Sequence, residues 1–215
     1  GRPTGKENWN TYYQFMNNQL TELLTNYGPI GAIWFDGVWD HPKSFDWQLE
    51  EQYALIHKLQ PACLVGNNHH RVPYVGEDFQ MFERDLPGEN TSGYSDGQEV
   101  SALPLETCET MNRTWGYNIE DQNYKSARTL IQLLVRAAGK NANLLMNIGP
   151  QPNSELPAVA VQRMKEMGEW MATYGETIYG TRAGDVEPHP WGVSTRKDNR
   201  LFIHVLDCQD ASLYI

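Results

Sequence analysis

The stretch Ile30-Gly31-Ala32-Ile33-Trp34-Phe35-Asp36-Gly37 decides the fold, because it reads as a strand that ends on a turn. Residues 30–35 form a short apolar run without polar alternation, which is typical of a strand buried on both faces, as in a parallel sheet. A helix is predicted at 8–26, where apolar residues recur at the spacing of one helix face, and Gly28-Pro29 ends it. The opening of the chain therefore indicates a helix followed by a parallel strand.

The same pattern continues along the chain. We predict further helices at 46–59, 123–138 and 156–174, and further strands at 62–66, 103–108 and 143–150. The segment 67–103, rich in Gly, Asn, Asp, Glu and Pro, is predicted to be a long loop, and loops of that length are usually functional or disordered. After Gly175 the pattern changes to strands separated by turns, of which 200–206 alternates most clearly.

Strands that alternate with helices imply parallel βαβ units and an α/β fold. Four such units fit half of a (β/α)₈ barrel, since a whole TIM-type barrel needs about 250 residues. The alternative is a small open sheet. The tail predicts a separate, mostly antiparallel module that begins near residue 180.

Composition excludes several classes of protein. Seventeen Lys and Arg against 27 Asp and Glu give a net charge of −10, which argues against a nucleic-acid-binding protein. No apolar run approaches the roughly 20 residues of a membrane-spanning helix. The three Cys are far apart and show no CxxC spacing. Seven Trp, 11 Tyr and six Phe suit a core, and they also suit a carbohydrate site, where sugar rings stack on aromatic faces.

Asp36 is the first catalytic candidate. In barrel enzymes the catalytic residues lie at the C-terminal ends of strands, and Asp36 directly follows one, flanked in sequence by Trp34 and Trp39. The alternative is that Asp36-Gly37 only forms a turn.

The second candidate group is Asn67-Asn68-His69-His70, at the end of the next strand. Adjacent side chains of an extended chain point in opposite directions, so we do not expect the two His to grip one metal. One of them could bind substrate hydroxyls while the other packs. Ordinary loop histidines are the alternative.

A glycosidase needs two carboxyl groups, one on either side of the bond that breaks. If Asp36 is one, the other comes from a set of five: Glu77, Glu83, Glu89, Glu106 or Glu109. Most of these must be solvated bystanders. Trp115-Gly116-Tyr117 could line the pocket. Signatures of phosphate loops, dinucleotide folds, zinc proteases and nucleophile elbows are missing from the sequence.

Several segments together resemble one family. They are Trp34-Phe35-Asp36-Gly37-Val38-Trp39, Glu106-Thr107-Cys108, Thr114-Trp115-Gly116-Tyr117, the run 143–150, Gly168-Glu169-Trp170 and the run 174–180. In this order, from about residue 8 to residue 182, they resemble the α-L-fucosidases of glycoside hydrolase family 29.

The resemblance implies a retaining exo-glycosidase that releases α-L-fucose from a fucosylated oligosaccharide or glycoconjugate, with no metal or organic cofactor. It implies that Asp36 is the nucleophile and Glu83 the acid/base, with Glu106 as the runner-up, and that Trp115 packs against the fucose. The other expected substrate contacts are Trp34, Trp39, His69 and His70. A periplasmic or secreted location is expected from this substrate class.

The resemblance also implies a domain plan. Residues 1–180 would form the C-terminal half of a (β/α)₈-like catalytic barrel, and residues 181–215 the beginning of a C-terminal antiparallel β-sandwich. Because the family's first barrel strands have no counterpart in these 215 residues, we expect the chain to be part of a longer enzyme. Two other functions stay open: a metal-dependent hydrolase that uses His69 and His70, and a carbohydrate-binding relative without turnover.

Overall fold

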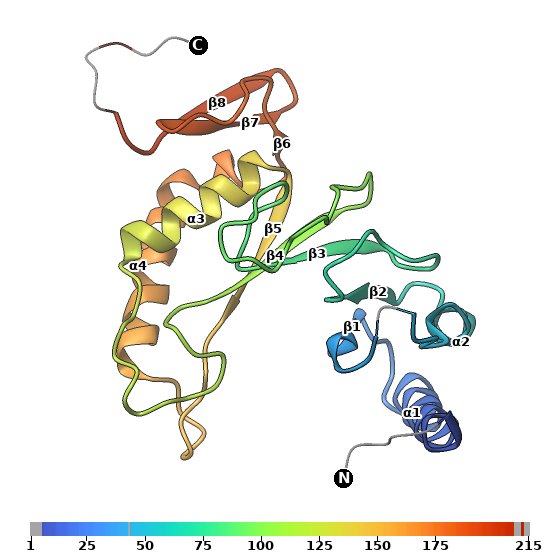
Figure 1. The fold of residues 1–215 in the computed structure, drawn as a ribbon. Coiled ribbons are helices and arrows are strands. Elements are labelled where there is room, and N and C mark those ends of the chain that lie inside the picture. The colour runs from blue at the N-terminus through green and yellow to red at the C-terminus, as the bar shows by residue number, and fades with distance from the viewer. Residues whose placement is uncertain (1–5, 43, 209–211, 213–215) are drawn as a thin grey trace. The chain divides into compact units, whose positions relative to one another are not determined.

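The computed structural model describes residues 6–42, 44–208 and 212. Figure 1 labels the helices and strands. In chain order they are α1 (Lys6–Asn26), β1 (Ala32–Phe35), η1 (Val38–Asp40), α2 (Leu49–Leu59), β2 (Leu64–Asn67), β3 (Phe79–Glu83), β4 (Leu105–Thr110), α3 (Ala127–Gly139), β5 (Ala142–Asn147), α4 (Ala158–Tyr174), η2 (Gly175–Thr177), β6 (Arg182–Ala183), β7 (Gly192–Lys197) and β8 (Arg200–Val205).

The strands form two sheets. Five parallel strands follow the order β1-β2-β3-β4-β5, and three antiparallel strands follow the order β6-β7-β8. Neighbouring parallel strands pair in register, with Phe35 beside Asn67 and Thr110 beside Asn147, so their C-terminal ends lie level. The α/β class and the separate antiparallel tail are therefore as the sequence predicts.

The predicted helices are present, with shifted ends. Helix α2 begins at Leu49 and not at residue 46, because Asp46 Oδ1 accepts a hydrogen bond from the Gln48 backbone N–H, and Gln48 has a left-handed backbone with φ 55°. Helix α3 begins after Ser126, whose side chain accepts from the Thr129 N–H as an N-cap. At α2 and α3, local hydrogen bonds thus set boundaries that apolar periodicity alone does not show.

The prediction that 67–103 is a single loop is wrong, because β3 lies inside it. The parallel sheet therefore has five strands, where four were predicted. Strand β3 is only five residues long and is buried along most of its length. Its flanks are rich in turn residues, and this composition hides the short apolar run Phe79-Gln80-Met81-Phe82.

The prediction that strand 30–35 is buried on both faces is also wrong for the residues that the structure describes. β1 is the first strand in the sheet order and alternates between exposed and half-buried positions. Ile33 and Phe35 pack against the core, whereas the Trp34 side chain is 39% exposed.

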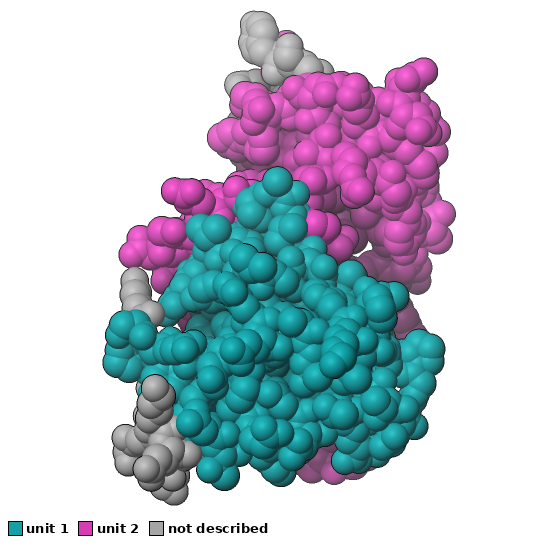
Figure 2. Space-filling view, turned by 90° about the vertical axis from the view of Figure 1, so that its right-hand side faces the viewer, with its two compact units in different colours: residues 1–81, 101–103 teal, residues 82–100, 104–215 magenta. Residues whose placement is uncertain are grey.

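The chain divides into two compact units, which Figure 2 colours separately. Unit 1 contains residues 1–81 and 101–103, and unit 2 contains residues 82–100 and 104–215. The division passes through β3, whose first three residues belong to unit 1 and whose last two belong to unit 2. The predicted domain boundary after residue 180 stays a prediction, and residues 209–211 and 213–215 of that predicted module lie outside the described residues.

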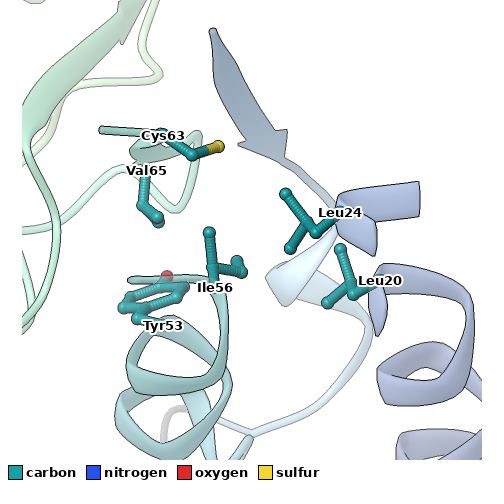
Figure 3. Packing of buried hydrophobic residues seen from close by; sticks show 6 residues of the cluster. All are labelled: Leu20, Leu24, Tyr53, Ile56, Cys63 and Val65. Carbon is teal, nitrogen blue, oxygen red and sulfur yellow. The ribbon is translucent and has the colours of Figure 1, made fainter. Parts of the chain in front are cut away.

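The core of unit 1 joins two helices to the sheet (Figure 3). Leu20 and Leu24 come from α1, Tyr53 and Ile56 from α2, and Val65 from β2. Tyr53 and Ile56 are three residues apart and lie on the same face of α2, so one helix face is fixed against the sheet. This packing holds the start of α2 beside the strand ends.

Unit 2 has its own core, built from α3, α4 and the loop after β4. Met111, Leu130, Ala160 and Met167 are its buried centre. The antiparallel sheet packs on α3 so closely that a Cβ at Gly139 would overlap Val193. None of the helices in the described part of the chain has both the length and the apolar character needed to cross a membrane.

Candidate active site

Asp36 follows β1 at the C-terminal end of the sheet in unit 1. Gly37, with φ 98°, makes the turn behind it, a conformation that favours glycine. Asn68, the first residue after β2, donates its backbone N–H to Phe35 O at 2.9 Å and its side-chain Nδ2 to Asp36 Oδ1 at 3.3 Å. The first two candidate groups of the sequence are thus brought together.

A buried polar cluster lies directly beside this pair. Its four members are Tyr53, Asn67, His69 and Glu77, none more than 7% exposed, and we call them the Glu77 cluster. Glu77 Oε1 accepts from the Tyr53 hydroxyl at 3.0 Å, and Asn67 Nδ2 donates to the same hydroxyl oxygen at 2.7 Å. His69 Nε2 lies 2.9 and 3.1 Å from the two Glu77 oxygens. Burial, together with the neighbouring Glu77 carboxylate, raises the pKa of Tyr53 well above its usual range, so this hydroxyl stays protonated.

The direction of each hydrogen bond in the Glu77 cluster follows from its acceptors. The backbone N–H of Arg71 donates to His69 Nδ1 at 3.0 Å, so Nδ1 bears no proton and Nε2 carries the N–H that points to Glu77. Glu77 is therefore an acceptor for two donors. Asn67 Oδ1, in contrast, is buried and has no hydrogen-bond partner among the described residues.

A cavity of about 280 Å³ opens beside Asp36 in unit 1. Asp36 and Gly37 line it together with the aromatic side chains of Trp9, Phe35 and Trp47. The Trp9 and Trp47 rings contact each other edge to face, with centroids 5.0 Å apart. An acidic group at the rim of an aromatic cavity is suited to a polyhydroxylated ring.

The other predicted contacts in unit 1 are more exposed. The Trp39 side chain is 58% exposed, and its ring centroid lies 6.1 Å from that of His70. His70 has a left-handed backbone with φ 57°. The two adjacent His thus have separate surroundings, His69 beside Glu77 and His70 beside Trp39.

Glu83 and Glu106, both in unit 2, lie at different distances from the C-terminal ends of their strands. Glu83 is the last residue of β3 and is 9% exposed. Glu106 is the second residue of β4, four residues before the strand ends at Thr110, which is about 13 Å of strand. Only Glu83 stands at the C-terminal strand end, where catalytic groups of such sheets are found.

Arg84 joins the end of β3 to the loop that carries Trp115. It has a left-handed backbone with φ 58°, and its N–H donates to Cys108 O at 2.8 Å. Its guanidinium lies 4.9 Å from the centroid of the Trp115 ring and donates to Arg113 O at 2.8 Å. The residue next to Glu83 therefore fixes the position of the Trp115 ring.

Asp85 holds the loop that follows Glu83. Its Oδ1 accepts from the backbone N–H groups of Thr91 and Ser92, each at 2.8 Å, and from the Thr91 hydroxyl at 2.7 Å. The Thr107 hydroxyl of β4 donates to Asp85 O at 2.6 Å. Burial by itself would raise the pKa of the Asp85 carboxyl, but these hydrogen bonds outweigh it and hold that pKa below its usual value.

The Trp115 loop is also held by the end of β5. Asn147 Nδ2 donates to Trp115 O at 2.7 Å and to Thr110 Oγ1 at 3.1 Å. A Cβ at Gly149 would stand 2.5 Å from Tyr117 N, so only glycine allows this close approach of two backbones. The segment that the sequence singled out at 143–150 thus supports the predicted sugar-binding ring.

The remaining acid candidates have other partners. Glu77 is enclosed in its cluster, Glu89 pairs with Lys140 at 2.9 Å, and Glu109 pairs with Lys125 at 3.5 Å. Across the ranges 6–42 and 44–208, no group of three or more His, Cys, Asp and Glu side chains is arranged to hold a metal ion.

The sequence did not reveal Tyr53 as a member of the Glu77 cluster, nor the contact of Asn68 with Asp36. Tyr53 lies 24 residues from Glu77, and it looks like any core position on an amphipathic helix. Asn68 was part of the second candidate group, but its partner Asp36 lies 32 residues earlier in the chain. Only the pairing of β1 with β2 brings them together.

Comparison with known proteins gives a consistent result. The family model described as alpha-L-fucosidase matches residues 2–176. The chain is similar to a putative alpha-L-fucosidase of Caenorhabditis elegans, 28% identical over 80% of this chain and 35% of that protein. It is also similar to the plasma alpha-L-fucosidase of Homo sapiens, 28% identical over 86% of this chain and 40% of that protein.

Solved structures show the same likeness. Alpha-L-fucosidase isoenzyme 1 from Paenibacillus thiaminolyticus is 34% identical, with a TM-score of 0.78 over 96% of this chain and 49% of that one. The alpha-fucosidase of Thermotoga maritima in complex with fucose is 27% identical, with a TM-score of 0.68 over 94% of this chain and 43% of that one. The chain thus spans between about a third and a half of the length of these proteins.

Proposed function

The chain belongs to the alpha-L-fucosidase family, and on that premise we propose that the whole protein hydrolyses α-L-fucosides with retention of configuration. The observation that carries the proposal is the place of Asp36. It follows the first parallel strand, it is hydrogen-bonded by Asn68, and it lines an aromatic cavity. A carboxylate held in this way is suited to attack an anomeric carbon.

The proposed mechanism has two displacements. In the first, Asp36 attacks the anomeric carbon, the bond to the leaving oxygen breaks, and Glu83 donates a proton to that oxygen. In the second, Glu83 takes a proton from water, which attacks the same carbon and releases fucose and the Asp36 carboxylate. Two inversions at one carbon give net retention.

The substrate contacts follow from the surroundings of each residue. We propose that Trp115 packs against the apolar face of the fucose, because Arg84 and Asn147 hold its ring and backbone. Trp34, Trp39 and His70 remain proposed contacts, with exposed or half-buried side chains. Both ring nitrogens of His69 already have partners, so we propose that His69 acts through Glu77 and not by touching the sugar.

The finer features of the fold belong to the same proposal. The five parallel strands would form part of a (β/α)₈-like barrel, and the β6-β7-β8 sheet the beginning of a β-sandwich. The substrate would be a fucosylated oligosaccharide or glycoconjugate. A periplasmic or secreted location fits that substrate, and fractionation of the source cells would test it.

Hydrolysis of 4-nitrophenyl α-L-fucoside by the whole protein tests the proposed function. We expect turnover, with α-L-fucose as the first anomer seen by proton NMR before mutarotation. First appearance of the β anomer would contradict the retaining mechanism. Fucose binding by folded protein without turnover would instead identify a binding-only relative.

A further inference from the structure

We propose that Glu77 is a positioning residue for Asp36. It holds both chain neighbours of Asn68 and so fixes the hydrogen bond that Asn68 donates to Asp36. The inference rests on the proposed function, since it assigns Glu77 a role in the reaction of the nucleophile.

Two sets of hydrogen bonds connect the chain neighbours of Asn68 to one carboxylate, that of Glu77. On one side of Asn68, the Asn67 side chain donates to the Tyr53 hydroxyl, which donates to Glu77 Oε1. On the other side, His69 Nε2 lies within hydrogen-bond distance of both Glu77 oxygens. The residues before and after Asn68 are therefore bound to the same buried group.

Because Asn67 and His69 are both held by hydrogen bonds, the direction of the Asn68 side chain between them is fixed as well. Anchoring Asn67 and His69 toward Glu77 fixes the backbone on both sides of Asn68, whose side chain faces Asp36 instead. Asn68 Nδ2 donates to Asp36 Oδ1 at 3.3 Å. This hydrogen bond restricts rotation of the Asp36 carboxylate, and orientation of the attacking group is a large part of the rate of such a step.

The two acceptor oxygens of Glu77 are essential to this arrangement. Since His69 Nδ1 accepts from the Arg71 N–H, His69 Nε2 carries a proton and needs an acceptor. Tyr53 also donates, which leaves its lone pairs for Asn67. A glutamine at position 77 keeps one oxygen that both donors can reach, but it replaces the second oxygen, 3.1 Å from His69 Nε2, with an amide group whose N–H faces the His69 N–H.

Two features set the cluster apart from ordinary packing. Gly76 has φ 94°, and a Cβ there would stand 3.0 Å from Tyr53 Cβ, so the turn before Glu77 is pressed against α2. Asn67 is oriented toward Tyr53 although this leaves its buried Oδ1 without a partner among the described residues. Buried amide oxygens normally have a hydrogen-bond partner, so the orientation of the Asn67 amide is determined by the hydrogen bond that it donates to Tyr53.

The test measures nucleophile reactivity for each active site. The whole protein is treated with 2-deoxy-2-fluoro-α-L-fucosyl fluoride, from which the nucleophile displaces fluoride to leave a slowly hydrolysed fucosyl-enzyme. Intact-mass spectrometry gives both the fraction of protein labelled and the rate constant of labelling. For Glu77→Gln we expect full labelling with a rate constant lowered about 10- to 100-fold, the range that a misplaced reacting group produces.

Tyr53→Phe keeps the ring and removes the hydroxyl that links Asn67 to Glu77. We expect full labelling at a rate lowered about 2- to 10-fold, as for the loss of one hydrogen bond. Matched controls are Glu51→Gln, an exposed carboxylate on α2, and Tyr13→Phe, whose hydroxyl donates to Gln48 O in the same unit. Both controls should label at the wild-type rate.

Each result of the labelling experiment either supports the positioning role of Glu77 or overturns it. Unchanged labelling rates in Glu77→Gln and Tyr53→Phe would overturn it. So would a reduced labelled fraction that reacts at the wild-type rate, because that result indicates partial unfolding only. If Glu77→Gln does not fold, Tyr53→Phe alone decides. A wild-type protein that neither labels nor hydrolyses the fucoside would instead overturn the proposed function itself.

Discussion

The two strand ends that carry the proposed catalytic carboxylates are built in different ways. Asp36 is exposed, and its hydrogen bond from Asn68 depends on buried side chains that come from α2, β2 and the turn at Glu77. Glu83 is buried, and the residues beside it are fixed through backbone groups, with Arg84 in a left-handed conformation and Asp85 accepting backbone N–H groups.

This difference matches the two chemical roles. A nucleophile must be aimed at the anomeric carbon, which a side-chain hydrogen bond to its carboxylate favours, whereas an acid/base must be held beside the leaving oxygen, which a fixed backbone favours. The comparison also distinguishes two ways in which a substitution can lower activity. Substitutions around Asp36 should change chemistry through side-chain orientation, whereas substitutions around Glu83 should act through the loop.

The largest expected effect comes from removing the nucleophile. We expect Asp36→Ala to lower kcat/KM by more than about 10⁴-fold for both activated and poor leaving groups, since no covalent intermediate can form. Added azide should attack the fucoside directly and give the β-fucosyl azide. Activity near the wild-type level would show that another group is the nucleophile.

The next effect separates Glu83 from Glu106. We expect Glu83→Ala to slow hydrolysis of poor leaving groups by about 10²- to 10⁴-fold and that of activated aryl fucosides much less, because the latter need little proton donation. Azide should restore turnover with retained configuration, and Glu106→Ala should show neither behaviour. The reverse pattern in the two variants would assign the acid/base role to Glu106.

A smaller effect tests the loop beside Glu83. The Asp85 carboxylate accepts three hydrogen bonds, so we expect Asp85→Asn to lower the free energy of unfolding by about 1.5–3 kcal/mol at pH 7. Because the folded-state pKa of Asp85 is depressed, this stabilisation is complete above the unfolded-state pKa of about 3.9 and is lost as pH falls through the lower folded-state value.

Urea unfolding of wild type and Asp85→Asn at several pH values measures this difference. The gap in unfolding free energy should be constant from pH 7 to about pH 5 and should narrow below about pH 4. Thr91→Val, which removes only the hydroxyl donor, should cost less than Asp85→Asn. A gap that grows as pH falls would contradict the proposed role of the carboxylate.

The smallest expected effect concerns Trp115, the ring that we propose packs on the sugar. A Cβ at Gly149 would press on Tyr117 N, so Gly149→Ala should displace the Trp115 loop at a cost of about 1–3 kcal/mol in stability. We expect a raised KM for the fucoside with kcat reduced less. Gly168→Ala on α4, where a Cβ meets open space, is the matched control. An unchanged KM in a folded Gly149→Ala variant would remove Trp115 from the sugar site.

The ends of β1 and β2 were predictable from the sequence, because apolar runs that stop at a polar residue mark them directly, whereas β4 and β5 end at Thr110 and Asn147 and not at the predicted residues 108 and 150. Asp36 and the group from Asn67 to His70 were found in this way. The family resemblance then selected Glu83 from five acid candidates, and Glu83 is the last residue of a strand that the sequence analysis did not find. The short β3 strand was missed because its surroundings have loop composition.

Contacts that join distant parts of the chain were not predictable. Tyr53 looks like a core residue on an amphipathic helix, and nothing near it in sequence indicates the Glu77 carboxylate 24 residues away. The same holds for Gly149, whose need for glycine depends on the backbone of residues 116 and 117. Local patterns locate the chemical groups, whereas the supports of those groups depend on tertiary packing.

The most direct test of the account is to identify the residue that becomes covalently labelled. The whole protein is trapped with 2-deoxy-2-fluoro-α-L-fucosyl fluoride, digested, and sequenced by tandem mass spectrometry. The account predicts that the fluorofucosyl group is attached to Asp36. A label on any other carboxylate, including Glu77 or Glu83, would contradict the assignment of the nucleophile and the positioning role built upon it.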